Sequence, residues 1–138
     1  MPTPLRRTAR CACGHLQVAT TGEPERVSSC SCTDCQRRTG SAFGVTAFFK
    51  ADQVELVSGH PKVFKRGADS GNSLSMNFCP DCGTTLYWTL EDHPGRVVVA
   101  VGCFADPGFP APERHVWAKR KHHWVQFPAE CTLYDEAP

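Results

Sequence analysis

Short runs in which apolar and polar residues alternate dominate the chain, and they predict β-strands rather than helices. The clearest alternation covers residues 74–78, whereas the nearly continuous apolar run at 96–104 predicts a central strand buried on both faces. Glycine, proline and serine separate these runs, as turns require. Further strands are expected at 15–20, 27–29, 43–49, 54–57, 62–65 and 84–90, with a loop at 67–73.

Helical periodicity is not sustained anywhere in the sequence, and only one helical turn is expected, at 33–38. Thr33 or Asp34 is the expected N-cap, and Gly40 is the expected end of the turn. The chain has no internal repeat, low-complexity run or linker. We therefore predict a single domain spanning 1–138, mainly β, built from small antiparallel sheets with at most short helical turns.

Composition and charge narrow the classes of function. The chain has 138 residues and a formal net charge of +1, so its overall charge does not indicate a nucleic-acid partner. The apolar run at 97–101 is too short to cross a bilayer, and residues 1–10 have no apolar run typical of a secretory signal. We expect a cytoplasmic protein without a membrane partner. Nine cysteines in a reducing compartment indicate metal binding, and their odd number excludes complete internal disulfide pairing.

Two pairs of closely spaced cysteines predict one structural zinc site. Cys11 and Cys13 precede Gly14, and Cys79 and Cys82 precede Gly83, so each pair lies on a tight turn. Four thiolates complete a tetrahedral zinc shell, which would join the N-terminal part of the chain to a turn in its second half. Local thiols or disulfides are the alternative, but a disulfide within Cys-x-Cys would be strained. The four predicted ligands are Cys11, Cys13, Cys79 and Cys82.

A second group, formed by Cys30, Cys32 and Cys35, lies within six residues and can converge on another zinc. Three thiolates with an open fourth position are typical of a catalytic zinc site, which would favour a small-molecule thiol as ligand. Two alternatives remain open from the residues alone. The site could be closed by Cys103, His115 or Asp34, or the thiols could form a metal-free, redox-sensitive cluster.

The cysteines occur in an ordered pattern that resembles the glutathione-dependent formaldehyde-activating enzyme family, also called the GFA or centromere protein V domain. The similarity spans about residues 8 to 127. It rests on the cysteine spacings and on residues 36–41, 78–83, 101–102, 106–107, 115–117 and 124.

This resemblance implies a β-tent fold and two zinc ions per chain. Cys11, Cys13, Cys79 and Cys82 would hold the structural zinc, and Cys30, Cys32 and Cys35 the catalytic one. The implied activity is a carbon–sulfur lyase reaction that combines glutathione, or a similar thiol, reversibly with formaldehyde or a related small aldehyde.

The sequence departs from the family pattern at two places. Cys103 lies in Gly-Cys-Phe-Ala-Asp at 102–106, where members usually have Gly-Thr-Leu-Asp, and we expect it to end the central strand as a buried thiol or a fourth zinc ligand. His122 and His123 precede Trp124 where a proline is usual, and we expect both to face solvent. We expect His115 to be packed in a strand, although a ligand or proton-carrying role stays open. Cys131 is expected to take no part in the site.

Basic residues near the second cysteine group suggest contacts with an anionic thiol. Arg37 and Arg38 directly follow this group, and their guanidinium groups can bind the carboxylates of glutathione. Lys65, Arg66 and the cations at 119–121 could extend this basic surface. The same tail, with Trp117 and Trp124, supports the alternative of a non-enzymatic zinc-stabilised module that binds protein or nucleic acid, although the near-neutral charge makes nucleic acid a poor partner.

Overall fold

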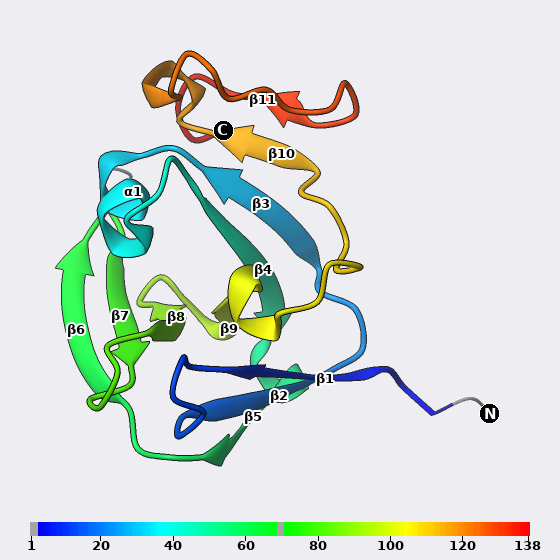
Figure 1. Ribbon diagram of the computed structural model, residues 1–138, viewed down its shortest axis with the longest axis vertical. Helices are drawn as coiled ribbons and strands as arrows, with labels where there is room; N and C mark the ends of the chain where they lie inside the picture. Colours follow the sequence, from blue (N-terminus) through cyan, green and yellow to red (C-terminus); the bar gives the residue numbers. More distant parts are fainter. Residues whose placement is uncertain (1–2, 69–70) are drawn as a thin grey trace.

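The computed structural model describes residues 3–68 and 71–138, and β-strands dominate it (Figure 1). The strands are β1 Arg6–Arg10, β2 Gln17–Thr21, β3 Arg26–Cys30, β4 Gly44–Lys50, β5 Val54–Ser58, β6 Lys62–Gly67, β7 Ser73–Phe78, β8 Thr85–Leu90, β9 His93–Ala100, β10 Arg114–Val116 and β11 Thr132–Leu133. Within these described residues, one α-helix, α1, spans Thr33–Thr39, and three short 3-10 turns are η1 Ala51–Gln53, η2 Val101–Phe104 and η3 Ala118–Arg120. The prediction of a mainly β fold with little helix is confirmed.

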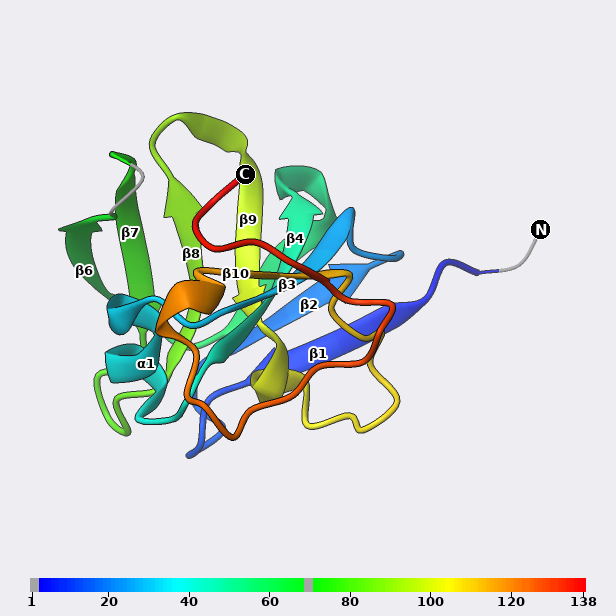
Figure 2. The ribbon, with the colours of Figure 1, turned by 90° about the horizontal axis from the view of Figure 1, so that it is seen from above.

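The strands form two sheets. One has three strands in the order β1-β2-β5, and the other has eight in the order β11-β10-β3-β4-β9-β8-β7-β6. Most neighbours are antiparallel, but β10 pairs in parallel with both β3 and β11. The first sheet lies across one end of the larger one, while the C-terminal segment lies at the opposite side, beyond β3 (Figures 1 and 2).

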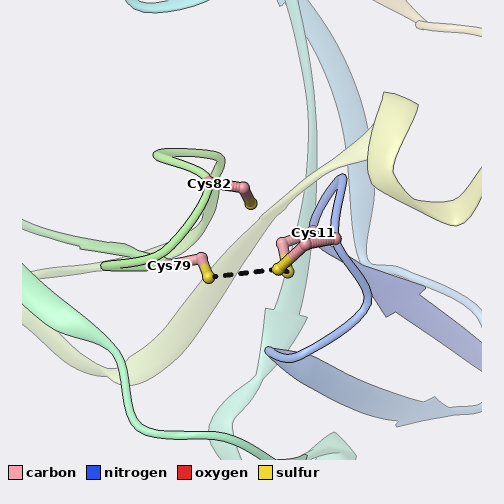
Figure 3. A group of neighbouring side chains, drawn as sticks. Cys11, Cys79 and Cys82 are labelled. Atoms are coloured by element: carbon pink, nitrogen blue, oxygen red, sulfur yellow. Dashed lines mark hydrogen bonds between the residues drawn. The ribbon is translucent and has the colours of Figure 1, made fainter.

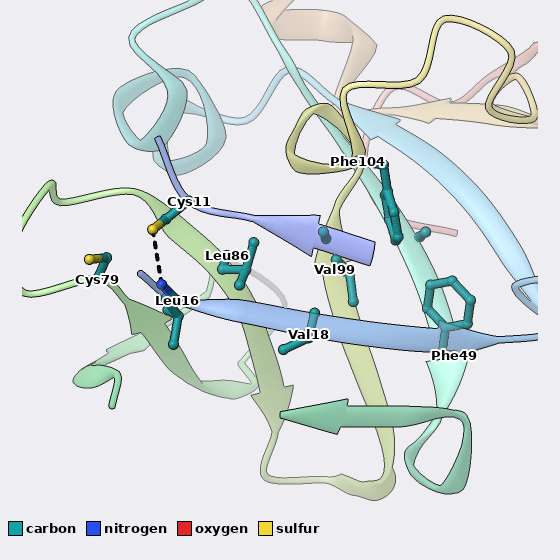
Figure 4. Close-up of a cluster of buried hydrophobic side chains, with 10 residues drawn as sticks. Cys11, Leu16, Val18, Phe49, Cys79, Leu86, Val99 and Phe104 are labelled. Carbon is teal, nitrogen blue, oxygen red and sulfur yellow. Dashed lines mark hydrogen bonds between the residues drawn. The ribbon is translucent and has the colours of Figure 1, made fainter. Parts of the chain in front are cut away.

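The main hydrophobic core lies between the two sheets (Figure 4). Leu16, just before β2, and Val18 of β2 meet Phe49, Leu86 and Val99 from the larger sheet, and all five side chains are almost completely buried. Burial of several large apolar side chains supplies most of the favourable free energy of folding in a domain of this size. Cys11 and Cys79 border this core, so the first cysteine group lies where the two sheets are joined.

Two strands differ from the predictions, and one predicted loop falls partly outside the described residues. The strand expected at 96–104 ends at Ala100, because the chain turns there into η2, so Cys103 lies in a 3-10 turn and does not end a strand. β1 was not predicted, because its sequence is mostly polar and only Ala9 is buried. The loop predicted at 67–73 includes positions 69–70, which lie outside the described residues; β6 runs to Gly67 and β7 begins at Ser73.

Candidate metal centres and substrate cavity

The first cysteine group consists of two facing turns (Figure 3). One turn begins at Cys11, whose carbonyl oxygen accepts a hydrogen bond from the Gly14 amide at 3.0 Å. In the other turn the Gly83 amide donates to the Cys79 carbonyl oxygen at 2.8 Å. Gly14 and Gly83 have φ angles of 81° and 80°, which side chains with a Cβ rarely adopt. The predicted roles of both glycines as turn residues are therefore confirmed.

The sulfur positions in this group fit a tetrahedral zinc shell. The Sγ atoms of Cys11 and Cys13 are 3.6 Å apart, and those of Cys13 and Cys79 are 3.7 Å apart. A tetrahedron of sulfurs with Zn–S bonds of about 2.3 Å has edges of about 3.8 Å. The Sγ atoms of Cys11, Cys13, Cys79 and Cys82 all lie within 4.8 Å of one another. The donor set and its spacing thus fit zinc.

The sulfurs of this group have backbone amides and a hydroxyl as hydrogen-bond partners. The Leu16 amide donates to Cys11 Sγ at 3.2 Å, and the hydroxyl of Thr84 lies 3.3 Å from Cys82 Sγ. Hydrogen bonding from the Thr84 side chain, followed by its backbone amide, lowers the pKa of Cys82 to about 5. Such contacts stabilise a thiolate, which is the form of cysteine that binds a metal.

The second cysteine group lies where β3 passes into α1. Cys30 ends β3, Cys32 precedes the helix, and Cys35 lies in its first half; their Sγ atoms lie within 4.8 Å of one another. The Cys32 amide donates to Cys30 Sγ at 3.4 Å, and the Cys35 amide donates to Cys32 Sγ at 3.3 Å. Hydrogen bonds from Cys30 and Cys35 lower the pKa of Cys32, and the charge of Arg66 acts in the same direction. The same group of contacts raises the pKa values of Cys30 and Cys35, so it is the close spacing of the three sulfurs that allows them to hold one metal.

Cys32, rather than Thr33 or Asp34, is the N-cap of α1, so that prediction was wrong. Its sulfur accepts from the Cys35 amide, as the oxygen of a capping serine would. At the other end Gly40 adopts a left-handed conformation and donates its amide to the Gln36 carbonyl oxygen, as predicted for a helix end. The Cys32 sulfur thus caps the start of the helix and also belongs to the candidate metal site.

The residues considered as a fourth ligand lie elsewhere or have other partners. Asp34 forms an ion pair with Arg66, with Oδ2 and Nη1 3.2 Å apart. Cys103 is in neither cysteine group, and burial raises the pKa of its thiol to about 11. Within the described part of the chain, no aspartate, glutamate, histidine or cysteine side chain adds a fourth donor to the group at Cys30. Within the described residues the group therefore offers three sulfur donors.

His115 in β10 is fully buried, and both of its ring nitrogens are hydrogen-bonded. Ser29 Oγ lies 2.7 Å from Nδ1, and Ser31 Oγ lies 2.6 Å from Nε2. The ring also stacks on Phe127, with centroids 4.0 Å apart. Burial lowers the pKa of His115 to about 4, so the ring is neutral at pH 7. The expectation of a packed strand residue is confirmed, and the ligand role is not, because both nitrogens have hydroxyl partners.

Gln36 connects the C-terminal segment to this loop. Its side-chain amide donates to the carbonyl oxygens of Ser31 at 2.7 Å and Arg120 at 3.2 Å, and its Oε1 lies 3.2 Å from His122 Nε2. In both ribbon views the segment around η3 lies beside α1 (Figures 1 and 2). His122 and His123 are exposed, as predicted.

Two cavities of similar size adjoin α1. One, of about 440 Å³, is lined by Asp34, Arg37, Arg38 and Arg66 together with apolar side chains that include Phe64 and Met76. The other, of about 430 Å³, also has Arg38 in its lining, together with residues of β4 and the turn at η2, including Cys103. The first cavity therefore combines three guanidinium groups with apolar walls, which suits an organic anion.

The basic tail is engaged in contacts of its own. Lys119 pairs with Glu136, and the cationic groups of Lys119 and Arg120 lie 5.2 and 5.3 Å from the centre of the Trp117 ring. Arg120 also donates to the Thr33 hydroxyl at 3.4 Å. Trp124 remains 64% exposed. These contacts attach the tail to the rest of the domain.

Three supporting residues, Ser29, Ser31 and Gln36, were missed as part of the site. The serines on either side of Cys30 are a weak signal in the sequence, because serine is usually exposed. Both are buried here, where they contact His115. His115 lies more than eighty residues further along the chain. No local pattern connects these positions.

Comparison with known proteins identifies relatives of this chain. Residues 6–120 match the family model described as glutathione-dependent formaldehyde-activating enzyme. Two fungal proteins provisionally carry that name. The one from Penicillium rubens is 26% identical over 87 residues, covering 62% of this chain and 44% of its own length. The one from Colletotrichum graminicola is 28% identical over 90 residues, with 63% and 46% covered. The chain thus spans less than half the length of these curated relatives.

A crystal structure of a Rhodobacter sphaeroides protein, a structural genomics target, has the same fold. It superimposes with a TM-score of 0.54 at 20% identity, covering 75% of this chain and 90% of that one. Within the described residues, no helix has both the length and the hydrophobicity to span a membrane. The family model covers most of the chain, and on this ground the chain belongs to the glutathione-dependent formaldehyde-activating enzyme family.

Proposed function

We propose that this protein binds two zinc ions and combines a low-molecular-weight thiol, such as glutathione, with formaldehyde or a related small aldehyde. Cys11, Cys13, Cys79 and Cys82 would hold a structural zinc. Cys30, Cys32 and Cys35 would hold the second, and the observation that carries the proposal is that this group has three converging thiols and no fourth donor within the described residues. The fungal relatives' names support the same chemistry.

The reaction forms one carbon–sulfur bond. The thiol sulfur adds to the aldehyde carbon, and the thiol proton passes to the aldehyde oxygen. The product is a hemithioacetal, and the reaction is a reversible one of the lyase class. When bound, zinc at the second group supplies a Lewis-acidic position that lowers the pKa of an incoming thiol. The uncatalysed addition is already facile, so the main contribution of the protein is to bring the reactants together.

The chain's own residues would bind and orient the thiol. Arg37, Arg38 and Arg66 line the cavity of about 440 Å³ beside α1, and their charges would attract the carboxylates of glutathione. Arg66 is held by Asp34, which fixes β6 against the helix. Phe64 and Met76 would contact the uncharged parts of the thiol and exclude water. We place the protein in the cytoplasm, where reducing conditions keep its nine thiols available.

Metal content and thiol binding test this proposal together. We expect two zinc ions per chain by elemental analysis, and saturable glutathione binding that shifts the spectrum of cobalt substituted at the second group. Cys32→Ser should lose the second metal and the glutathione response. Cys131→Ser, which changes a buried thiol outside both groups, is the matched control and should keep both.

Turnover is tested by exchange NMR with ¹³C-formaldehyde and glutathione at equilibrium. The protein should accelerate exchange between free aldehyde and the hydroxymethyl adduct above the spontaneous rate, and Cys32→Ser should not. If glutathione neither binds nor perturbs the second metal, the proposed function is wrong. A role as a binding module would then be tested with single-stranded and duplex nucleic acid at low salt.

A further inference from the structure

Arg38 occupies an unusual position between the two cavities beside α1. It lines both the cavity of about 430 Å³ and the cavity of about 440 Å³, and the walls that the two cavities share consist of Arg38, Gly83 and Thr85. Arg37, by contrast, is exposed and lines only the second of them. A side chain at this position can reach a ligand on either side.

The guanidinium group of Arg38 has one unused edge. Its Nε and Nη2 atoms are buried and have no hydrogen-bond partner. Nε–H and one Nη2–H lie on the same edge of a guanidinium group and point in parallel directions. Such an edge matches the two oxygens of a carboxylate in a bidentate pair. Buried donors are normally satisfied, so this unsatisfied pair requires an explanation.

Two neighbours hold the group in its present position. The guanidinium carbon of Arg38 lies 4.6 Å from the centre of the Trp88 ring, within range of a cation–π contact. Gly44 provides the space beside it, because a Cβ at Gly44 would lie 2.5 Å from Arg38 Nη2. In this position the free edge is buried, while the side chain as a whole lines both cavities.

We propose that Arg38 is a carboxylate-binding residue that rests on Trp88 and turns its Nε/Nη2 edge into the cavities when a substrate carboxylate arrives. The inference rests on the proposed function for the identity of the substrates, but not for the presence of the anion site. Formaldehyde has no carboxylate, so the anion comes either from the thiol or from a larger aldehyde that carries an acid group. In both cases Arg38 would bind a carboxylate.

Fluorescence of Trp88 reports directly on this movement. In a Trp117→Phe, Trp124→Phe background, Trp88 is the only indole, since the chain has three tryptophans. We expect glutathione and S-methylglutathione to change its emission, because both carry two carboxylates. Glutathione diethyl ester, which carries none, should leave it unchanged. S-methylglutathione cannot bind a metal as thiolate, so its response tests the anion site even if the proposed function fails.

Calorimetry on the native chain provides the affinity without any tryptophan substitution. Arg38→Gln should weaken binding of glutathione about tenfold to a hundredfold, the range for loss of a charge-assisted pair. Arg38→Lys should recover little of the loss, because an ammonium group lacks the parallel edge. Arg6→Gln removes the same charge from an exposed site on β1 and is the control, with affinity expected within about twofold of the native value.

Gly44→Ala tests the position of the Arg38 guanidinium on Trp88 while keeping its charge. The new Cβ would displace only the flexible end of Arg38, so the fold should persist while the guanidinium leaves Trp88. Emission of Trp88 should then match the ligand-bound value before any ligand is added, and glutathione affinity should be retained or increased. Loss of glutathione binding in this variant would contradict the proposed movement.

The source of the carboxylate follows from two further titrations. If the thiol supplies it, glutathione should move Trp88 and its ester should not. If the aldehyde supplies it, glyoxylate, an aldehyde with an acid group, should move Trp88 whereas formaldehyde should not. The inference is wrong if neither glutathione, S-methylglutathione nor glyoxylate changes the emission, or if Arg38→Gln leaves the affinity of all three unchanged. If glutathione still perturbs the second metal while Arg38→Gln leaves the affinities of both glutathione and glyoxylate unchanged, this inference is overturned and the proposed function stands.

Discussion

The Ser31 hydroxyl lies 2.6 Å from Nε2 of His115, deep in the protein, and this contact joins β10 to the loop that carries the second cysteine group. Ser29 makes the equivalent contact with Nδ1 at 2.7 Å, so the two serines that flank Cys30 share one imidazole. Ser29 also lies within 3.4 Å of the Arg114 carbonyl oxygen, to which its hydroxyl can donate. His115 Nδ1–H then donates to Ser29, and Nε2 accepts from Ser31.

His115→Phe should weaken the second metal without affecting the first. A phenyl ring preserves stacking on Phe127 but leaves both serine hydroxyls without their partner, so the loop around Cys30 loses its fixed geometry. Loss of a supporting contact behind a metal site typically lowers metal affinity by about 10- to 100-fold. Chelator competition that resolves the two metals is the measurement, with His123→Ala as an exposed control. Equal weakening of both metals would indicate general destabilisation instead.

His115 should also make stability depend on pH. Burial lowers its pKa to about 4 from 6.5, so the unfolded chain takes up this proton first as the pH falls. The folded state is therefore favoured above about pH 6.5, and this contribution, up to about 3 kcal/mol, is lost progressively as the pH falls toward 4. Urea unfolding with and without His115→Phe, at saturating zinc and at pH 4.5 to 7.5, gives the contribution by difference. Parallel pH profiles for the two proteins would contradict it.

Cys11→Ser should cost far more stability than Cys131→Ser, although both thiols are buried. Cys11 belongs to the group that joins the two turns and borders the main core, whereas Cys131 lies in neither cysteine group. If zinc occupies the first group, its loss should reduce the free energy of unfolding by on the order of 5 kcal/mol or more. Thermal unfolding followed by circular dichroism, with zinc content measured on the same samples, tests this. Similar melting temperatures for the two variants would argue against a structural metal.

The Asp34–Arg66 ion pair should contribute modestly to stability and more clearly to the site. Its atoms are 3.2 Å apart and the side chains are 33% and 18% exposed, so solvent screens the pair only partly. A double-mutant cycle with Asp34→Asn and Arg66→Gln should give a coupling free energy of about 0.5–1 kcal/mol in urea unfolding. Arg66→Gln should also raise the reactivity-derived pKa of Cys32, measured by iodoacetamide alkylation of metal-free protein, because a neighbouring positive charge is removed. An unchanged pKa would contradict this electrostatic effect.

Local sequence determined the features that depend on neighbouring residues. The two cysteine groups, the turns at Gly14 and Gly83, the end of α1 at Gly40 and most strands could be predicted, because each depends on spacing or on alternation within a few residues. The predictions failed where contacts with distant parts of the chain decide the local structure. β1 is polar and becomes a strand through its pairing with β2, while the apolar run after Ala100 turns into η2, where Phe104 packs in the main core.

Only the tertiary structure decided what surrounds the cysteines. It places His115 between Ser29 of β3 and Ser31 just after that strand, Gln36 between the cysteine loop and the tail, and Arg38 over Trp88 in the space left by Gly44. Each contact joins segments that are separate in the sequence, so no local pattern could have predicted it. A sequence can show which residues are able to bind a metal or an anion, but their neighbours depend on how the sheets pack.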